Sequence, residues 1–408
     1  MTQKTRVAPA LFALALGGFG LGLTEFVAMG LIPQLAADLL PEIWAGDPER
    51  ATAQAGWLIS AYALGVVVGA PTIAALSARF PRRALLLWCV GVFTFGSVAS
   101  ALSPTFELVL VSRFVAGLPH GAYFGIAALV AARLMGPGRR GVGVAVVLSG
   151  LTLANVVGVP TATFVGQTFG WRSAYVVVTV VFVVAFLALA ATLPHQAGDP
   201  TATLRRELGA LKRGQVWLAL LTGAIGFGGL FAVYTYVAPM VTEVAGLDEG
   251  VVPWALVAIG LGMTLGNVLG GAGSDRHVGR TMMISFGVLA LGLVGVALGA
   301  SWTPTLFAAL FVTGAAASAL SPAIQTRLMD VAGDSQTLAA AINHAALNIG
   351  NSLGAWLGGI TIAAGLGYLS PAWVGLALCA GGVVFAVISL SLPDGVERHQ
   401  RSQEPVAP

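Results

Sequence analysis

The chain has 408 residues, of which 57% are hydrophobic and only 9% are charged, and its mean hydropathy is +0.88. Since an ordinary soluble domain has about 25% charged residues, this chain has too few charges to cover a water-exposed surface. The composition excludes a soluble enzyme, a nucleic-acid-binding protein and a disordered scaffold. The sequence also lacks the alternation of apolar and polar residues that is typical of outer-membrane barrels. We therefore expect an all-α membrane protein with several spanning helices.

Twelve segments are long and apolar enough to cross a membrane, because a spanning helix needs about 20 mostly apolar residues. The first segment has no cleavage pattern and is longer than the apolar region of a signal peptide, so we expect the protein to retain it. The predicted spans are 8–34, 53–76, 84–103, 107–134, 141–166, 173–193, 215–240, 252–273, 281–301, 304–327, 336–365 and 371–392.

The distribution of Lys and Arg predicts the orientation of the spans, because basic residues favour the cytoplasmic side. If both termini are cytoplasmic, seventeen of the 20 basic residues fall on the inner side, and only Arg50 and Arg172 fall outside. Acidic residues cluster in the outer segments. We therefore expect a multi-pass protein of a bacterial inner membrane with both termini in the cytoplasm.

The longest inner loop divides the spans into two sets of six. We expect an N-terminal six-helix bundle at 1–193, a cytoplasmic linker at 194–214, and a C-terminal bundle with a short tail at 215–408. Within the linker, Leu204, Leu208 and Leu211 share one helical face among basic residues, which favours a short amphipathic helix on the inner membrane surface. A plain solvated linker is the alternative.

Similar turns follow the second span and the eighth span. The first turn contains Ser77-Ala78-Arg79 with trailing Arg82 and Arg83, and the second contains Ser274-Asp275-Arg276 with trailing Arg280. Two six-span halves related by an axis along the membrane normal are typical of carriers that bind their substrate between the halves.

The second turn resembles the signature loop of the major facilitator superfamily, Gly-x-x-x-Asp-Arg-x-Gly-Arg, with one extra residue at His277-Val278. The first turn departs from it, with Ala74, Ala78 and Pro81 in place of Gly, Asp and Gly. The resemblance implies that these loops close the inner side, with more weight on Asp275 than on the first loop. The expected inner-gate residues are Arg79, Arg82, Arg83, Asp275, Arg276 and Arg280.

Three further segments resemble motifs of the same family. The segment from Arg113 to Gly117 is similar to its Arg-x-x-x-Gly motif, which implies a role for Arg113 in proton translocation. Gly158-Val159-Pro160 is similar to the antiporter motif, which implies that Gly158 and Pro160 bend the fifth span. The segment around Glu25 resembles the start of the twelve-span drug:proton antiporter branch, which includes efflux carriers for chloramphenicol, arabinose polymers and purines.

Glu25 and Arg113 are the two charged residues that lie inside predicted spans rather than in loops or at span ends. A charge within the membrane is costly and indicates function. At about 1.5 Å per residue, the two residues lie within a few ångströms of the same depth. We expect them to face each other or to share a water-filled cleft, where protonation of Glu25 would loosen its hold on Arg113. A static buried pair that fixes helix packing is the alternative.

Polar residues within the apolar runs are candidates for a substrate cavity. His344, Asn348 and Asn351 share one helical face at spacings of four and three residues. Hydrogen bonding between helices is the alternative interpretation of such residues, and free Cys89 and Cys379 are interpreted as packing residues. The candidate cavity residues are His120, Tyr123, Asn155, Tyr234, Asn343, His344 and Asn348.

Together these features predict a monomeric secondary carrier that exports a small organic molecule in exchange for protons. The chain has no Gly-x-x-x-x-Gly-Lys-Ser/Thr signature, so we expect no nucleotide, no other cofactor, no metal and no catalytic residue. The expected partners are a small-molecule substrate, protons and membrane lipid, without nucleic acid. One alternative is a carrier of the same fold for a sugar, nucleoside or amino acid. A membrane-embedded enzyme or a channel is a less favoured alternative.

Overall fold

The structure is a computed structural model that describes residues 7–77, 80–136, 139–194, 213–332 and 336–392. These residues form helices joined by short turns, and no strand occurs among them. The predicted linker helix and Arg79 lie outside the described residues. We refer to residues 7–194 as the N-terminal half and to residues 213–392 as the C-terminal half.

The N-terminal half runs through thirteen helical segments, several of which are parts of one bent span. They are α1 (Val7–Phe26), η2 (Val27–Gly30), α2 (Ile32–Leu39), α3 (Pro41–Gly46), α4 (Pro48–Ala55), α5 (Trp57–Ser77), α6 (Arg82–Leu102), α7 (Phe106–Gly117), α8 (His120–Met135), α9 (Arg140–Leu153), η3 (Ala154–Gly158), α10 (Val159–Phe169) and α11 (Trp171–Thr192).

The C-terminal half is built in the same way, with short irregular turns within longer helices. Its segments are α13 (Gly214–Gly226), α14 (Gly228–Thr235), α15 (Val237–Pro239), η5 (Met240–Val244), η6 (Glu249–Val251), α16 (Val252–Gly299), α17 (Thr303–Ala332), α18 (Gln336–Thr361), η7 (Ile362–Leu366) and α19 (Ser370–Ser391).

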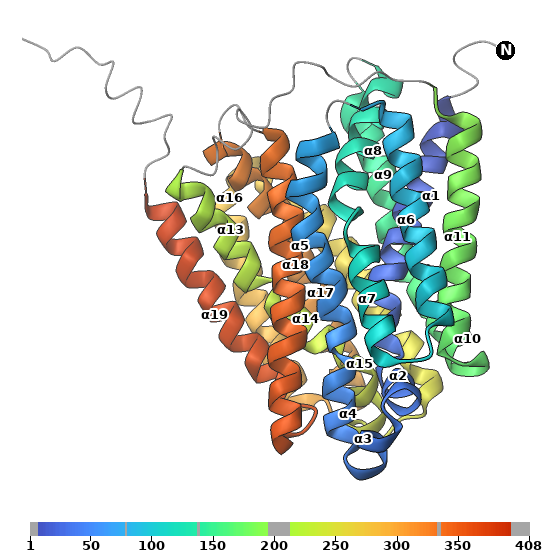
Figure 1. Cartoon of the computed structure of the whole chain (residues 1–408). Helices are drawn as coiled ribbons and strands as arrows, with labels where there is room; N and C mark the ends of the chain where they lie inside the picture. Colours follow the sequence, from blue (N-terminus) through green and yellow to red (C-terminus); the bar gives the residue numbers. More distant parts are fainter. Residues whose placement is uncertain (1–6, 78–79, 137–138, 195–212, 333–335, 393–408) are drawn as a thin grey trace, which may run out of the picture.

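Eleven helical stretches among the described residues are long and apolar enough to cross a membrane. This number is one lower than the twelve predicted spans because α16 runs through two of them. A straight helix of 48 residues would be about 72 Å long, more than twice the roughly 30 Å of a bilayer core. The backbone of His277 leaves helical geometry, with φ −152° and ψ 94°. The segment α16 is therefore two crossing helices that meet at His277 (Figure 1).

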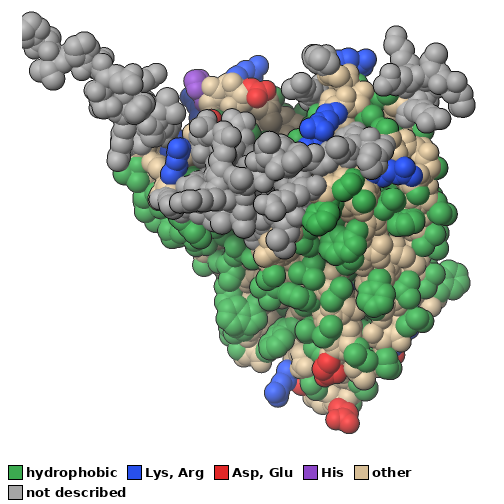
Figure 2. Space-filling model, turned by 45° about the horizontal axis from the view of Figure 1, so that its top comes forward, with side chains coloured by type: hydrophobic (Ala, Val, Ile, Leu, Met, Phe, Trp, Pro, Cys, Tyr) green, Lys and Arg blue, Asp and Glu red, His purple; other side chains and the backbone are tan. Residues whose placement is uncertain are grey.

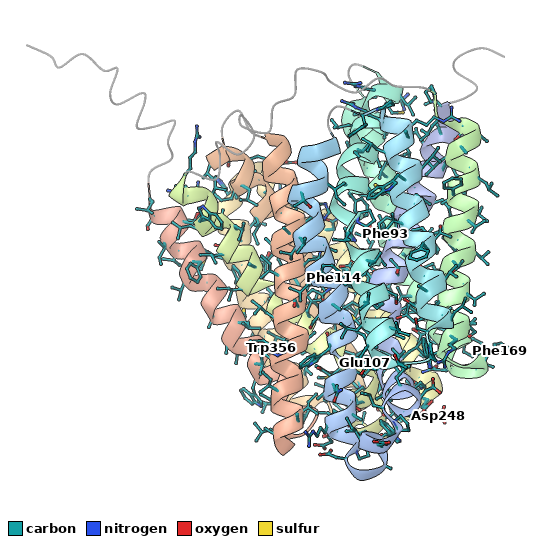
Figure 3. All side chains as sticks on the ribbon, viewed as in Figure 1. Phe93, Glu107, Phe114, Phe169, Asp248 and Trp356 are labelled. Atoms are coloured by element: carbon teal, nitrogen blue, oxygen red, sulfur yellow. The ribbon has the colours of Figure 1, made fainter. Side chains whose placement is uncertain are left out.

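Charged side chains gather at the two ends of the molecule, and hydrophobic side chains cover the face between them (Figure 2). We call the end near the N-terminus the basic end and the opposite end the acidic end; Glu107 and Asp248 mark the latter in Figure 3. Large apolar side chains such as Phe169, Trp254 and Trp302 are exposed around the sides. An apolar belt between two polar ends suits a helical protein whose sides face lipid.

The two halves stand side by side in Figure 1 and are joined by hydrogen bonds at the acidic end. Gln34 and Gln167 of the N-terminal half each donate from Nε2 to Glu249, to its carboxylate and its backbone carbonyl respectively, both at 3.0 Å. Nearer the middle, the hydroxyl of Ser60 donates to the carbonyl of Ser352 at 3.3 Å. These bonds hold the halves together on the acidic side.

Removing the carboxylate of Glu249 should loosen this closure. Glu249→Ala deletes the bond from Gln34, which is worth about 1 kcal/mol, or roughly a fivefold shift between joined and parted halves. A cysteine at Ala238, which is buried where the halves meet, should react with a maleimide about fivefold faster. The control is Glu243→Ala, because Glu243 lines the same pocket and is exposed. Equal labelling rates in the two variants would contradict the prediction.

A second contact at the acidic end orients α11 against α2. The carboxylate of Asp38 forms an ion pair with Arg172 and accepts a hydrogen bond of 3.0 Å from the indole of Trp171. Partial burial acts to raise the pKa of Asp38, but the hydrogen bonds from Arg172 and Trp171 outweigh it and lower the pKa below its ordinary value. The ionised form is therefore the one that the fold stabilises.

The pH dependence of this contact follows from the lowered pKa. Its contribution is present above the ordinary carboxyl pKa of about 3.9, and it is lost as the pH falls through the lower folded-state pKa. Both side chains are about half exposed, so Asp38→Asn should cost no more than about 1 kcal/mol at pH 7. Thermal unfolding in detergent should show this difference at pH 7 and little difference near pH 3. A difference that does not depend on pH would contradict it.

Candidate functional site

Arg113 anchors the broken end of the first span. The segment α1 ends at Phe26 and continues as a 3₁₀ turn, which leaves carbonyl groups without helical partners. Nη1 of Arg113 donates to the backbone oxygen of Thr24 at 2.5 Å and to its hydroxyl at 3.2 Å, and Nη2 lies 3.5 Å from the backbone oxygen of Glu25. The guanidinium is fully buried. It therefore fixes the backbone that carries Glu25.

Two tyrosine rings complete the surroundings of Arg113. Its guanidinium carbon lies 4.5 Å from the ring centre of Tyr62 on α5 and 5.9 Å from that of Tyr175 on α11. An aromatic face stabilises a desolvated cation. Tyr62 approaches closely because Gly117 lacks a side chain where α7 crosses α5. In the Arg-x-x-x-Gly motif, Arg113 thus supplies the cation, and Gly117 leaves the space that Tyr62 needs to approach it.

The carboxyl group of Glu25 lies where the two halves meet. It is 5% exposed, and the groups near enough to interact with it electrostatically include Arg113 and Tyr62 of its own half and Asn351 and Tyr234 of the C-terminal half. Arg113 lies close to Glu25, but the described contacts of the guanidinium go to the backbone, and no ion pair with the carboxylate is described. The carboxyl group is free to respond to the opposite half.

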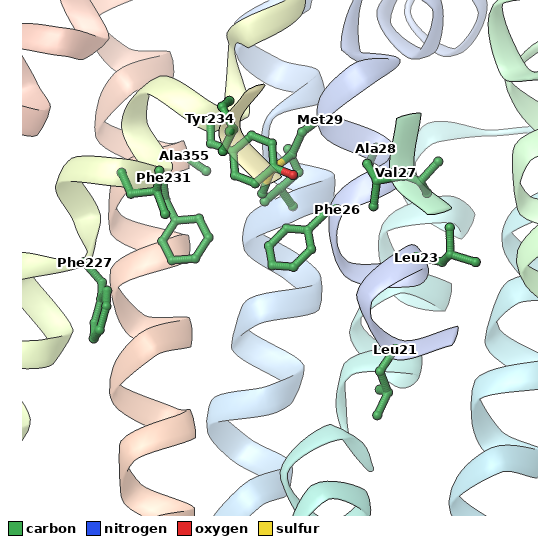
Figure 4. Close-up of a cluster of buried hydrophobic side chains, with 14 of the residues drawn as sticks. Leu21, Leu23, Phe26, Val27, Ala28, Met29, Phe227, Phe231, Tyr234 and Ala355 are labelled. Carbon is green, nitrogen blue, oxygen red and sulfur yellow. The ribbon is translucent and has the colours of Figure 1, made fainter. Parts of the chain in front are cut away.

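Aromatic side chains connect the halves beside Glu25. The ring of Phe26 stacks on that of Tyr234, with centroids 5.4 Å apart, and on that of Phe231 at 6.4 Å (Figure 4). The hydroxyl of Tyr234 is buried without a hydrogen-bond partner among the described residues, and the buried amide of Asn351 reaches toward the carboxyl group of Glu25. Buried polar groups that lack partners are costly, which makes the Tyr234 hydroxyl a candidate contact for a cargo molecule.

Two of the predicted cavity residues meet across the halves. The ring centroids of His120 on α8 and His344 on α18 are 6.0 Å apart. Phe124 stacks on His344, with centroids 5.4 Å apart and planes at 3°. The hydroxyl of Tyr62 lies 2.9 Å from Nδ1 of His120.

The other predicted cavity residues are more scattered. The amide of Asn343 donates to Gln325, and that of Asn348 donates to the carbonyl of His344 on its own helix. Both retain a buried carbonyl oxygen without a described partner, as does Asn155. Tyr123 instead packs inside the N-terminal half, where its hydroxyl donates to the carbonyl of Leu14 at 2.8 Å.

Gly158 and Pro160 coincide with a change of helix type. The fifth span passes from α9 into the π-helix η3 and then into α10, where Pro160 lies in the first turn. Proline lacks the amide that a continuous helix requires. At this turn the backbone of Asn155 packs against Gly260 of the other half.

The predicted inner-gate residues do not form one cluster in this structure. Arg83 donates to the carbonyl of Ala190 at 2.5 Å, which ties α6 to α11 within one half. Arg82 lies beside it at the start of α6, and Asp275, Arg276 and Arg280 are exposed. No contact between these C-terminal residues and the N-terminal half is described. A joint role for the two loops stays a prediction for another conformation.

Two pockets are described, and neither is lined by a predicted cavity residue. One, of about 180 Å³, lies between the halves at the acidic end and includes Gln34, Trp44 and Glu249. The other lies on the apolar side near Trp88 and Phe95.

Several residues of this site do not stand out in the sequence. Tyr62 was not singled out, although it is the one tyrosine in α5 and contacts both Arg113 and His120. Phe124 and the hydroxyl of Thr24 were also missed, since neither residue type stands out in an apolar span. Arg327, at the end of the tenth predicted span, is buried near the basic end, where it donates to the backbone oxygen of Ser389 at 2.5 Å.

Comparison with known proteins identifies the family. The sequence model of the Major Facilitator Superfamily matches residues 14–252 and 232–407. The chain belongs to the major facilitator superfamily. This superfamily member is 38% identical to the inner membrane transport protein YdhP of Escherichia coli over 368 residues, which cover 88% of this chain and 90% of YdhP. It is 33% identical to a chloramphenicol resistance protein of Streptomyces lividans over 384 residues, 93% of this chain and 94% of that protein.

A solved structure supports the fold of this superfamily member. The crystal structure of a D-xylose-proton symporter superposes with a TM-score of 0.76 over 95% of this chain and 98% of the other, at 18% identity. At that identity the match concerns the fold alone. The chain is therefore a multi-pass membrane transporter with the major facilitator fold, as the sequence motifs predict.

Proposed function

We propose that this transporter exports a small organic molecule across a bacterial inner membrane in exchange for protons. The observation that carries the proposal is Glu25, the one buried acidic side chain among the described residues, at the contact between the halves. A single ionisable group at that contact can bind a proton, and its surroundings change when the halves move relative to each other. The relatives named above support an export role and an inner-membrane location.

The proposed cycle alternates access between the two sides. In the structure the halves are joined at the acidic end, which we take as the periplasmic side because basic residues favour the cytoplasm. Both termini would then be cytoplasmic, and the six spans of each half would move as a bundle around the linker at 194–214. Glu25 would bind a proton from the periplasm and release it to the cytoplasm, with cargo moving the other way.

The neighbours of Glu25 suit such an exchange. Beside it in the C-terminal half lie the amide of Asn351, which reaches toward its carboxyl group, and the buried hydroxyl of Tyr234, which has no hydrogen-bond partner among the described residues. A neutral, protonated Glu25 holds these groups less strongly than a carboxylate does, because hydrogen bonds to an ionised acceptor are stronger. Proton binding would therefore free the C-terminal half to move, while Arg113 keeps the Glu25 backbone in place.

Transport by inverted membrane vesicles tests the proposal. Vesicles with an acidic lumen should accumulate radiolabelled chloramphenicol, and a protonophore should abolish the accumulation. The recovered compound should be chemically unchanged, as expected of a transporter without catalytic activity. Accumulation of D-xylose but not chloramphenicol would favour the sugar-carrier alternative. Chloramphenicol accumulation that persists without a proton gradient would contradict proton coupling.

A further inference from the structure

His120 and His344 come from opposite halves and meet in the interior of the protein. His120 is 2% exposed, and its ring centroid is 6.0 Å from that of His344. Phe124 packs on both rings, at centroid distances of 5.3 Å and 5.4 Å. This is a contact between two imidazoles from helices that must separate if the halves move.

Tyr62 joins this histidine pair to the Glu25 region. One end of its side chain, the hydroxyl, lies 2.9 Å from Nδ1 of His120. Its ring lies under the guanidinium of Arg113 at 4.5 Å, and its hydroxyl is within electrostatic reach of Glu25 and Arg113. One side chain thus contacts both groups of ionisable residues.

No acidic side chain is described in contact with His120; Glu25 of α1, a helix that packs against α8, is connected to it through Tyr62. The titratable groups facing it are Tyr62 from α5 and His344 from α18. Tyr123, on the same helix as His120, donates its hydroxyl hydrogen bond to the carbonyl of Leu14 in α1. Cys89 of α6 lies near Tyr123. The α9 sequence from Gly141 to Leu153 contains no titratable residue.

The surroundings of His344 are similar. Of the helices packed against α18, α14 contributes Tyr234, which stacks on the far side with Phe26. Cys379 of α19 is engaged with a backbone carbonyl, and α13 carries no titratable residue. Arg327 and Asp330 of α17 lie toward the basic end.

We infer that His120 and His344 form a second proton-binding site, which Tyr62 connects to the Glu25–Arg113 region. The inference rests on the proposed proton-coupled function. Two imidazolium groups so close together, one of them buried, would repel each other, so the contact in the structure is one between neutral rings. Each ring takes one proton from water at its free nitrogen when the halves part, and it returns that proton to water before they join.

This arrangement ties proton binding to the position of the halves. Acid should favour the conformation in which α8 and α18 are apart, within the range of about pH 5 to 8 in which histidine titrates. The hydroxyl of Tyr62 makes the hydrogen bond to His120, and the two rings also meet edge to face with centroids 5.9 Å apart. Tyr62→Phe should therefore keep the ring contacts with Arg113 and His120 and break the hydrogen-bonded connection. Glu25→Gln should then no longer shift the pH midpoint of the histidine-dependent change.

Distance measurements on the full chain in lipid nanodiscs test the inference without any cargo. Spin labels at Thr168→Cys and Glu243→Cys, both exposed at the acidic end on opposite halves, report the joined and parted states. Both native cysteines are buried and would be replaced by alanine. Double electron–electron resonance should show a longer distance at pH 5 than at pH 8. The change should be lost in the double variant His120→Asn, His344→Asn and retained in the control His277→Asn, an exposed histidine.

The outcomes separate this inference from the proposed function. A pH-dependent distance that persists in the double histidine variant overturns the inference, even if vesicle transport remains proton-driven. A histidine-dependent distance change together with transport that ignores the proton gradient overturns the proposed function instead. If the double variant does not reproduce the distance that the parent chain shows at pH 8, the single variant His344→Gln is measured instead. It removes one of the two histidine charges, so the distance change between pH 8 and pH 5 should fall to half or less.

Discussion

Glu25→Gln is expected to abolish proton-driven accumulation of cargo while leaving the fold intact. Glutamine has the shape of a protonated glutamate but cannot release a proton. Exchange of one proton for one neutral cargo molecule supports at most about tenfold accumulation per unit of pH difference, and the variant should fall to no accumulation. The Arg113 contacts go to backbone oxygens of Thr24 and Glu25, so they survive the substitution. Vesicle accumulation of labelled chloramphenicol measures the effect.

Cargo exchange provides the internal control for this variant. Vesicles preloaded with unlabelled chloramphenicol should still take up labelled compound by counterflow, because exchange needs no net proton movement. The matched acid is Glu107, which is exposed at the start of α7, so Glu107→Gln should accumulate cargo like the parent chain. Full accumulation by Glu25→Gln would show that the proton site lies elsewhere. Loss of counterflow would indicate that Glu25 acts in cargo binding rather than in coupling.

The fold could be predicted from the sequence because a bilayer imposes strict rules. Apolar segments of about 20 residues have no other stable location, and the motif around Arg113 and the loop at Asp275 add the family. The exception is instructive. The sequence predicts a turn at 274–280 between the eighth and ninth spans, whereas the structure keeps helical hydrogen bonding on both sides of a single kink at His277.

The candidate site could be predicted only in part. A charged or polar residue within an apolar segment can be recognised in the sequence, but the sequence does not show which side chains of different helices contact each other. Glu25, Arg113, His120 and His344 stand out as polar groups in spans, and the structure brings them into two neighbouring groups. Their connection through Tyr62 depends on where α5 crosses α7, which no periodicity encodes. Tyr123 was predicted as a cavity residue on the same reasoning as His120, but helix α8 turns it toward α1.

The partners of Arg113 show why the predicted pairing was incomplete. A guanidinium in an apolar span suggests a carboxylate partner, and Glu25 is the nearest one in depth. The break in α1 exposes the backbone oxygen of Thr24, however, and the planar guanidinium fits such acceptors well. The broken helix end therefore takes the hydrogen bonds that sequence reasoning assigned to the carboxylate.

Gly117→Ala should disable the site without altering any of its polar groups. A Cβ atom at Gly117 would lie 2.1 Å from the carbonyl oxygen of Tyr62 and 3.1 Å from Cα of Gly65, so α5 must move away from α7. Overpacking of this kind costs about 1–3 kcal/mol. It also lifts the ring of Tyr62 away from Arg113, so proton-driven accumulation should fall by about tenfold or more, because each 1.4 kcal/mol of lost preference is a factor of ten.

Two other glycines separate the effect on the site from general destabilisation. A Cβ at Gly125 on α8 would meet nothing within 4 Å, so Gly125→Ala should be stable and active. A Cβ at Gly143 would lie 2.6 Å from the carbonyl oxygen of Ala131, a similar backbone clash between α8 and α9 away from Tyr62 and Arg113. Gly143→Ala should therefore lower the melting temperature about as much as Gly117→Ala but retain more transport per folded molecule. Equal transport losses in these two variants would mean that the α5–α7 crossing contributes only stability, and the motif glycine would then have no part in coupling.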